Sequence, residues 1–340
     1  MNAGPVSAGG APHGDMAEVT TIFQQPWWLE ATAPGAWGAV EIVENGRIVA
    51  RHPYALYRRL GMARLSMPPL TQTLGPWIAP AQGRPEALLS REHALLGELL
   101  AKLPRHDLYS QAFHHSLTNW LPFYWRGFTQ TTRYTYLLDL SQPGEKIWAG
   151  MRDKTRNTVR KAERTGITVA ASDDVDLLAW LCERTLERHG VVVSELRSLV
   201  RRVDEAARRR GASRLLVARG SDGVPHCAVY CVHDRQACYN LLQGADPAFR
   251  SSGAAALAVW QAVRYAAGVS ATFDFEGSML RPVEHFVRSF AARQTPYFYV
   301  RRESRRLKLL SLGRELLRLA APAPAPDSLR RPPDDDATAG

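Results

Sequence analysis

The sequence lacks the features that mark metal-binding, exported and membrane-spanning proteins. It has only four cysteines in 340 residues, and none of them shows the CxxC spacing of zinc and redox sites. No apolar run approaches the ~20 residues that a spanning helix needs. The first residues also lack the basic segment and apolar run that make up a signal peptide. We therefore expect a cytoplasmic protein with reduced, buried cysteines and no metal.

Both ends of the sequence also lack apolar periodicity. Residues 1–18 are rich in Ala, Gly and Pro, and residues 320–340 are rich in Pro and then acidic. Such compositions bury too little apolar surface to offset the entropy lost on ordering. We expect two disordered tails around a folded region.

Positive charge is in excess, with 43 Lys and Arg against 33 Asp and Glu. Much of it lies in residues 151–165, 197–214 and 301–318, which all look helical. Such a helix either turns a solvated face to water or binds an anionic partner such as a nucleic acid. Residues 304–319 predict a basic amphipathic helix, which either packs on the protein or contacts an anionic membrane.

One plan of strands and turns occurs twice. Residues 37–57 predict a hairpin with Asn-Gly at its turn, and residues 213–234 repeat the plan with Asp-Gly. Helical segments lie between them. We therefore expect an α/β (α+β) fold of two similar domains, residues 19–144 and 145–303. Each is predicted to be a mixed, mostly antiparallel sheet flanked by helices.

A segment of small residues opens an Ala-rich helix within residues 240–268. The first N–H groups of a helix have no internal partner, and with the helix dipole they suit a phosphate or pyrophosphate. The alternative is a tight packing contact between helix and sheet. The segment consists of Arg250, Ser251, Ser252, Gly253, Ala254 and Ala255.

The stretch FDFEGS, residues 273–278, alternates aromatic and acidic side chains. On a strand, Asp274 and Glu276 share one face and the two phenylalanines share the other. The acids either work as a pair in a cleft, or they end the strand and cap the next helix.

The order of these features resembles the GNAT acyltransferases. The spacing R-x-x-G-x-A of residues 250–255 is similar to their Q/R-x-x-G-x-G/A signature, and strand, helix and strand follow in the GNAT order. The segments RDKTRNTVRKAERTGI, RSSGAAAL, FDFEGS and FVRSFAA resemble the tandem-GNAT, FemAB-like superfamily. Segments of the first half extend this likeness over most of the chain.

The resemblance implies transfer of an acyl group from acyl-CoA, the co-substrate, to an amine or hydroxyl. The acceptor would be a small molecule or a cell-envelope precursor. Family chemistry places the pyrophosphate on residues 250–255 and an oxyanion near the backbone of the preceding strand. A carboxylate then takes the acceptor's proton. We expect one donor site, in the second half, with Asp274 as the base and Glu276 as a helix cap. Further implied residues are His285 as a proton shuttle, Tyr239 as an acid for the leaving thiolate, and Leu241 to Gln243 as oxyanion donors.

Two further segments offer binding residues. Residues 145–166 look like one helix that matches the family's basic helix, where Arg156, Arg160 and Lys161 either hold a phosphorylated ligand or form a solvated face. The aromatic residues Trp120 and Tyr124 either stack on a sugar or base, or belong to the core.

The donor has an alternative within the resemblance. Peptidoglycan-branching members use aminoacyl-tRNA and tend to show F-K-x-x-F-G-G, where this chain has FVRSFAA at 286–292. The missing lysine and glycines favour acyl-CoA over tRNA. A third interpretation is a degenerate binding protein of the same fold.

Overall fold

The computed structural model describes residues 21–187, 195–277 and 279–309. The chain divides into two units, residues 1–302 and 303–340. In the second unit the description covers residues 303–309 only, of which 305–309 are helical. The predicted tails and most of the predicted helix 304–319 lie outside the described residues.

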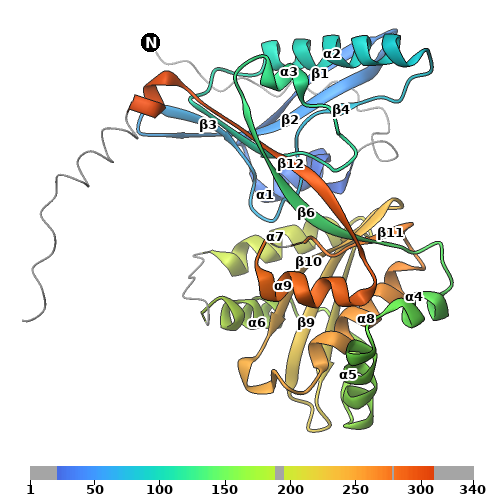
Figure 1. Ribbon diagram of the computed structural model, residues 1–340. Helices are drawn as coiled ribbons and strands as arrows, with labels where there is room; N and C mark the ends of the chain where they lie inside the picture. Colours follow the sequence, from blue (N-terminus) through green and yellow to red (C-terminus); the bar gives the residue numbers. More distant parts are fainter. Residues whose placement is uncertain (1–20, 188–194, 278, 310–340) are drawn as a thin grey trace, which may run out of the picture. The chain divides into compact units, whose positions relative to one another are not determined.

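Twelve strands of the first unit form a single sheet, in the order β1-β2-β3-β5-β12-β6-β11-β10-β9-β8-β7, with β4 paired to β2 (Figure 1). The strands are β1 (Trp37–Glu44), β2 (Arg47–Arg59), β3 (Met62–Ser66), β4 (Trp77–Ile78), β5 (Leu108–Ala112), β6 (Thr129–Asp139), β7 (Thr168–Ala171), β8 (Ser213–Arg219), β9 (Pro225–His233), β10 (Ala237–Ala245), β11 (Thr272–Asp274) and β12 (Arg293–Glu303).

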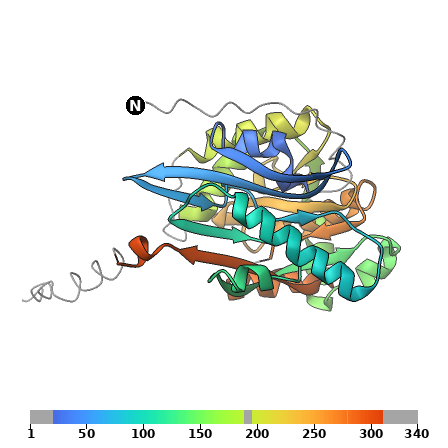
Figure 2. The same cartoon turned by 90° about the horizontal axis from the view of Figure 1, so that it is seen from above.

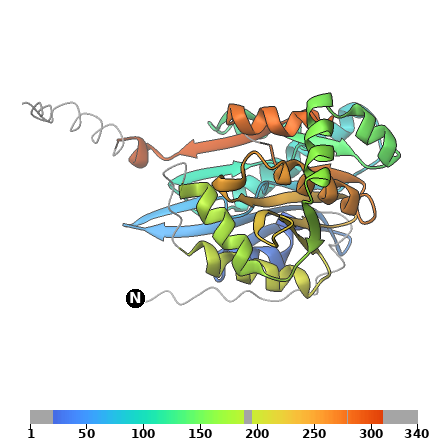
Figure 3. The same cartoon turned by 90° about the horizontal axis from the view of Figure 1, so that it is seen from below.

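Helices pack on the faces of this sheet. Figure 2 shows α2 crossing the strands of the first half, and Figure 3 shows α6 in front of the strands of the second half. The helices are α1 (Pro26–Thr32), α2 (Pro85–Lys102), α3 (Leu121–Tyr124), α4 (Gly144–Gly150), α5 (Asp153–Arg164), α6 (Val175–Glu187), α7 (Leu196–Arg208), α8 (Ala254–Ala266) and α9 (Arg281–Val287), with 3₁₀ turns η2 (Ile22–Gln24), η3 (Pro247–Phe249) and η4 (Arg288–Phe290).

The predicted repeat is confirmed. Each half has three antiparallel strands, then a helix, then a strand that pairs in parallel with the third one. This gives β1-β2-β3-α2-β5 in the first half and β8-β9-β10-α8-β11 in the second. Asn45 and Gly46 both have positive φ, as a tight hairpin turn requires. The mixed α/β fold class is confirmed as well.

The two halves exchange their last strands. Strand β6, from the first half, pairs with β11 of the second, and β12 returns from the second half to lie between β5 and β6. Nine residue pairs join β6 to β12, from Thr129–Arg301 to Leu137–Arg293. The sheet is therefore continuous between the two halves of the chain. A domain boundary between residues 144 and 145 stays a prediction.

The segment 145–166 is two helices rather than the single one expected. Arg152, between α4 and α5, has an extended backbone, and its N–H donates to the carbonyl of Ser289 at 2.9 Å. The predicted single basic helix is therefore interrupted at Arg152.

Candidate active site

The parallel strands β10 and β11 pair over only three residues, Ala237–Tyr239 with Thr272–Asp274. Just beyond this point, β10 contains a bulge. Its register against β9 passes from Asn240–Cys231 to Leu242–Tyr230, so Leu241 is an extra residue. Bulges redirect backbone groups and are frequent beside active sites. The predicted oxyanion donors Leu241 to Gln243 begin at this bulge.

The two acids lie at the end of β11. Asp274 is 3% exposed, while Phe273 and Phe275 enter the core under α8. The alternation predicted from the sequence is therefore confirmed. Glu276 has a positive φ of 52°, a conformation that non-glycine residues rarely adopt and that recurs at functional sites.

Thr135, on β6, organises the acids. Its hydroxyl donates to Oδ1 of Asp274, and it accepts from the N–H of Gly277 at 3.2 Å and from Nε2 of Gln72 at 3.3 Å. The N–H of Glu276 also donates to Asp274 Oδ1, at 2.8 Å. The carboxylate of Asp274 is thus held by donors from both halves of the chain.

Burial raises the pKa of both acids. Desolvation raises the pKa of Asp274 to about 6, although the bonds from Thr135, the Glu276 N–H and Gln72 oppose the rise. Desolvation and the nearby Asp274 charge raise the pKa of Glu276 well above its usual value. Oε1 of Glu276 is buried and has no hydrogen-bond partner among the described residues. Near pH 7, Asp274 is therefore largely a carboxylate, beside a glutamate whose pKa is raised.

The predicted capping role of Glu276 is wrong. Helix α9 begins after Leu280, and no side chain of the described residues caps it. The left-handed backbone of Glu276 turns the chain four residues earlier, so its carboxyl group stays beside Asp274 instead of reaching a helix end.

Replacing Thr135 with Val should move the pH dependence of the reaction. The variant removes a donor to the ionised Asp274, so its pKa rises further. One charge-assisted bond corresponds to roughly one pH unit. We expect the rising limb of kcat/KM against pH to shift upward by that amount. Thr135→Ser keeps the hydroxyl and should retain the wild-type limb; equal limbs for all three proteins would contradict this role.

Tyr239 and His285 are placed differently. Tyr239 pairs with Asp274 in the sheet, is buried, and packs on Phe23 with ring centroids 4.6 Å apart. Burial raises the pKa of its phenol well above 10, so it stays protonated. Nε2 of His285 lies 2.9 Å from Nη1 of Arg152, which can only donate, so this nitrogen accepts. The acid and shuttle roles of these residues stay predictions.

The predicted phosphate loop leads into α8. Gly253 has φ +81° and precedes the helix, and a Cβ there would lie 3.0 Å from the carbonyl oxygen of Thr158 on α5. Ala254 is buried, whereas Arg250 and Ser251 are exposed. The tight-packing alternative therefore describes Gly253 and Ala254, while the start of the loop faces outward.

One polar group near the bulge was missed by the sequence analysis. Oδ1 of Asn240 is buried and has no hydrogen-bond partner among the described residues. An orphaned buried acceptor costs about 1–3 kcal/mol, so it marks a place where a ligand donor is favoured. No pattern along the chain marks this residue, because an Asn on a strand is ordinary.

The basic helix α5 uses its arginines internally. Arg156 donates to the carbonyls of Ala149 and Met151, at 2.5 and 2.8 Å, and pairs with Asp153. It thereby satisfies carbonyls freed by the break between α4 and α5. Arg160 lies over the ring of Trp148 at 5.5 Å. Lys161 is exposed and has no ion-pair partner within the described ranges.

The arginines at 197–214 all have intramolecular partners. Four form ion pairs, Arg197 with Glu183, Arg201 with Asp176, Arg208 with Asp173 and Asp204, and Arg209 with Glu205. Arg202 donates to the Ala31 carbonyl, and Arg210 and Arg214 lie over Trp27 and Tyr265. The predicted solvated face of this helix is therefore largely neutralised by neighbouring acids.

Trp120 and Tyr124 belong to the first half. Their rings are 5.5 Å apart at helix α3, where Trp120 packs on the core and Tyr124 is exposed. No ring contact or hydrogen bond of the described residues joins them to the carboxyl pair. Their ligand-binding role stays a prediction.

The corresponding strand end in the first half is closed. Beyond the parallel pair β3–β5, the segment after β3 returns and donates from Leu74 N to the Ala112 carbonyl at 2.7 Å. Met67 Sδ accepts from Ala112 N. These contacts cover the end of β5, which supports a donor site in the second half.

The four cysteines agree with the prediction of reduced, buried thiols. All four cysteines are free and buried. Among the described residues, no helix is long and apolar enough to cross a membrane, and no cluster of His, Cys, Asp or Glu could hold a metal.

Residues 149–286 match the family model described as an acetyltransferase (GNAT) domain. These residues therefore form a domain of the GNAT acyltransferase superfamily. This range contains the bulge, the loop 250–255 and both acids, so the predicted superfamily and the prediction of an acyltransferase enzyme are confirmed.

Solved structures extend the likeness to the first half. FemX shares 12% identity over 84% of this chain and 93% of its own, with a TM-score of 0.62. A conserved protein of unknown function from Bacteroides thetaiotaomicron shares 12% over 85% and 91%, with a TM-score of 0.50. A tandem GNAT protein from the clavulanic acid biosynthesis pathway shares 11% over 79% and 83%, at 0.48. At these identities the likeness concerns the fold alone. No curated protein matches this sequence.

Proposed function

We propose that this GNAT-superfamily member transfers an acyl group from acyl-CoA to an amine or hydroxyl, beside the Leu241 bulge. The observation that carries the proposal is the carboxyl pair. Asp274 and Glu276, both with a raised pKa, lie at the end of the short parallel pair β10–β11, where the bulge begins. A carboxyl group whose pKa burial raises to about 6 is suited to take and release a proton near neutral pH.

The residues around the bulge fit the co-substrate. The thioester of acyl-CoA supplies an activated acyl group. Its amide N–H groups suit the orphaned Oδ1 of Asn240, and its phosphates suit exposed Arg250 and the first N–H groups of α8. These protein groups can hold a thioester donor by hydrogen bonds and charge, without metal ligands.

Asp274 is placed to take a proton. Its carboxylate is fixed by Thr135 and by the Glu276 N–H, so it keeps one orientation when an acceptor arrives. A base with a pKa of about 6 is ionised at neutral pH and still accepts a proton from an ammonium or hydroxyl in the transition state.

A second candidate donor is aminoacyl-tRNA. The fold similarity to FemX favours it, because a FemAB-like fold is shared with branching enzymes. Four of the seven arginines between 197 and 214 are paired with acids, which opposes it, since RNA binding needs cations free to contact phosphates. Transfer from CoA thioesters in protein treated with ribonuclease would remove the tRNA alternative; strict dependence on charged tRNA would replace acyl-CoA.

Calorimetric titration with acetyl-CoA and longer acyl-CoAs tests the donor. We expect saturable binding, weakened by about tenfold in Arg250→Gln, because one charge-assisted phosphate contact is lost. Arg264→Gln, at the other end of α8, is the matched control and should bind as wild type. If folded protein binds none of these thioesters, the acyl-CoA proposal is wrong.

We also propose the class of acceptor, the cellular location and a membrane contact. A small or envelope-precursor acceptor would approach Asp274 on the face opposite the core phenylalanines. Mass spectrometry of products formed from acyl-CoA and a metabolite extract identifies it. The cytoplasmic location and the membrane contact of residues 304–319 rest on the sequence only.

A further inference from the structure

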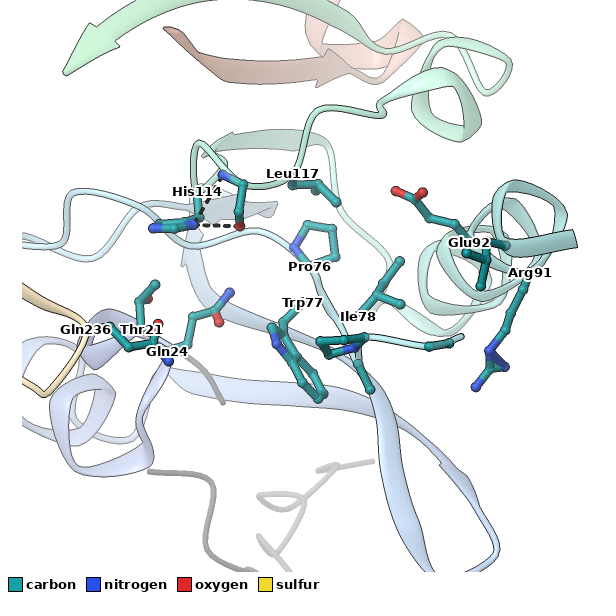
Figure 4. Close-up of a pocket in the computed structure, with 15 residues that line it drawn as sticks. Thr21, Gln24, Pro76, Trp77, Ile78, Arg91, Glu92, His114, Leu117 and Gln236 are labelled. Atoms are coloured by element: carbon teal, nitrogen blue, oxygen red, sulfur yellow. Dashed lines mark hydrogen bonds between the residues drawn. The ribbon is translucent and has the colours of Figure 1, made fainter. Parts of the chain in front are cut away.

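A second site lies in the first half, away from the carboxyl pair. A pocket of about 440 Å³ opens between η2, the segment 76–81, the start of α2 and the loop after β5 (Figure 4). Its volume falls in the range of small-ligand sites. Its lining comes from η2, from β4 and the residues around it, from α2 and from the loop that follows β5.

One side of this pocket offers uncharged polar groups. Figure 4 shows Thr21, Gln24 and Gln236 together on one side of Trp77. Oγ1 of Thr21 is buried and has no hydrogen-bond partner among the described residues. Gln24 is almost fully buried, and its Nε2 donates to two carbonyls of the segment that follows β3. Thr21 and Gln24 come from one stretch of chain and Gln236 from another, and the two bonds of Nε2 hold the Gln24 side chain in place.

The imidazole of His114 adds a fixed donor. Its Nδ1 accepts from the N–H of Ser116 at 3.3 Å, so the proton of the neutral ring lies on Nε2. Desolvation lowers the pKa of His114 to about 3, so the ring stays neutral at physiological pH. It contributes a donor and no charge.

The charge of the pocket excludes phosphates. Arg91 is bound at 2.9 and 3.2 Å by both carboxylate oxygens of Glu44, which cancels its charge. Glu92 has no ion-pair partner among the described residues, so it leaves a negative charge on the other side of Trp77. Helix α2 begins with Pro85 and has Glu86 in its first turn, so its N-terminus offers fewer N–H groups and repels anions.

We propose that this pocket binds a saccharide that carries a free amine. An aromatic ring with amide, hydroxyl and imidazole groups beside it suits the apolar face and hydroxyl groups of a sugar ring. The carboxylate of Glu92 suits an ammonium group. The proposal does not depend on the donor site, because binding here needs no acyl-CoA.

Ligand titration of the full-length protein with glucosamine, glucose and glucose 6-phosphate tests this site. We expect glucosamine to bind about tenfold tighter than glucose, because its amine pairs with Glu92, and glucose 6-phosphate to bind weakest. Glu92→Gln should abolish the preference for glucosamine and leave glucose binding unchanged. Thr21→Val, nearly isosteric, should weaken both sugars several-fold. Trp77→Leu should weaken both by about tenfold, while Trp125→Leu, an exposed tryptophan on another element, should change nothing.

Thermal unfolding shows whether each variant is folded, so a loss of binding by a folded variant can be assigned to the substituted side chain. The proposal is overturned if neither glucosamine nor glucose binds. It is also overturned if glucose 6-phosphate binds more tightly than both. Binding that survives both Glu92→Gln and Trp77→Leu unchanged also overturns it. Failure of acyl-CoA binding would leave these results untouched, so the two proposals fail separately.

Discussion

Asp274→Asn is expected to lower kcat by about 10²- to 10⁴-fold, the usual contribution of a positioned general base. The amide keeps the shape of the side chain, and its oxygen still accepts the Thr135 hydroxyl and the Glu276 N–H. The protein should therefore stay folded. Rates measured at saturating donor and acceptor report the loss.

The pH dependence separates this role from a structural one. In the wild type, kcat/KM should rise with pH through about 6 as Asp274 ionises. In Asp274→Asn that limb should vanish. Glu276→Gln, the matched control, removes the second acid but leaves Asp274, so it should keep a rising limb. A rising limb that persists unchanged in Asp274→Asn would assign the base to another group.

The same variant is expected to be more stable than the wild type at neutral pH. The pKa of Asp274 rises from 3.8 in the unfolded chain to about 6 in the folded protein. Between these values the folded state binds more protons, so the free energy of unfolding falls as pH rises. Above pH 6 the full penalty applies, about 3 kcal/mol for a shift of this size. Below pH 4 it disappears, because Asp274 is protonated in both states.

Denaturant unfolding at pH 4 and pH 7.5 measures this difference. The gain of Asp274→Asn should be near zero at the lower pH and largest at the higher one. A variant that is less active and less stable at both pH values would show that Asp274 serves the fold rather than the reaction.

Of the variants proposed here, Gly277→Ala is expected to lower the free energy of unfolding most. A Cβ at Gly277 would lie 2.3 Å from the carbonyl oxygen of Tyr134 and 2.7 Å from the Cα of Thr135. Both are backbone atoms of β6, which is held by β11 and β12 and cannot move aside. We expect the free energy of unfolding to fall by about 3 kcal/mol or more, as for severe overpacking.

The matched control is Gly144→Ala. A Cβ at Gly144, the first residue of α4, would meet nothing within 4 Å, so this variant should be neutral or slightly stabilising. Unfolding curves for the three proteins give the comparison. If the two alanine variants lose the same stability, the close approach of Gly277 to β6 does not constrain the fold.

Local patterns explain what the sequence predicted well. Turn residues at 45–46 located a hairpin, since only certain residues accept positive φ there. The alternation at 273–276 placed the phenylalanines inside and the acids opposite, because strand side chains alternate. Small residues at 251–255 marked the start of α8. Each of these signals lies within a few residues of chain.

The network around Asp274 depends on distant residues. Thr135 stands 139 positions from Asp274, and Gln72 comes from a segment after β3. Neither has a distinctive neighbourhood in the sequence. The exchange of β6 and β12 between the halves brings them together, and a pattern along one strand does not record which strand will lie beside it.

The sequence by itself determined the family order of elements, the repeat and the acids at the end of β11, because these follow from local periodicity and turn chemistry. Only the tertiary structure decided which charges are free. It pairs Arg197 and Arg201 with acids on α6 and turns Arg156 onto the end of α4. Beside Asp274 it leaves Glu276 with an oxygen that no described residue pairs. Charge pairing and desolvation depend on neighbours in space, so composition alone overstated the positive surface and understated the carboxyl pair.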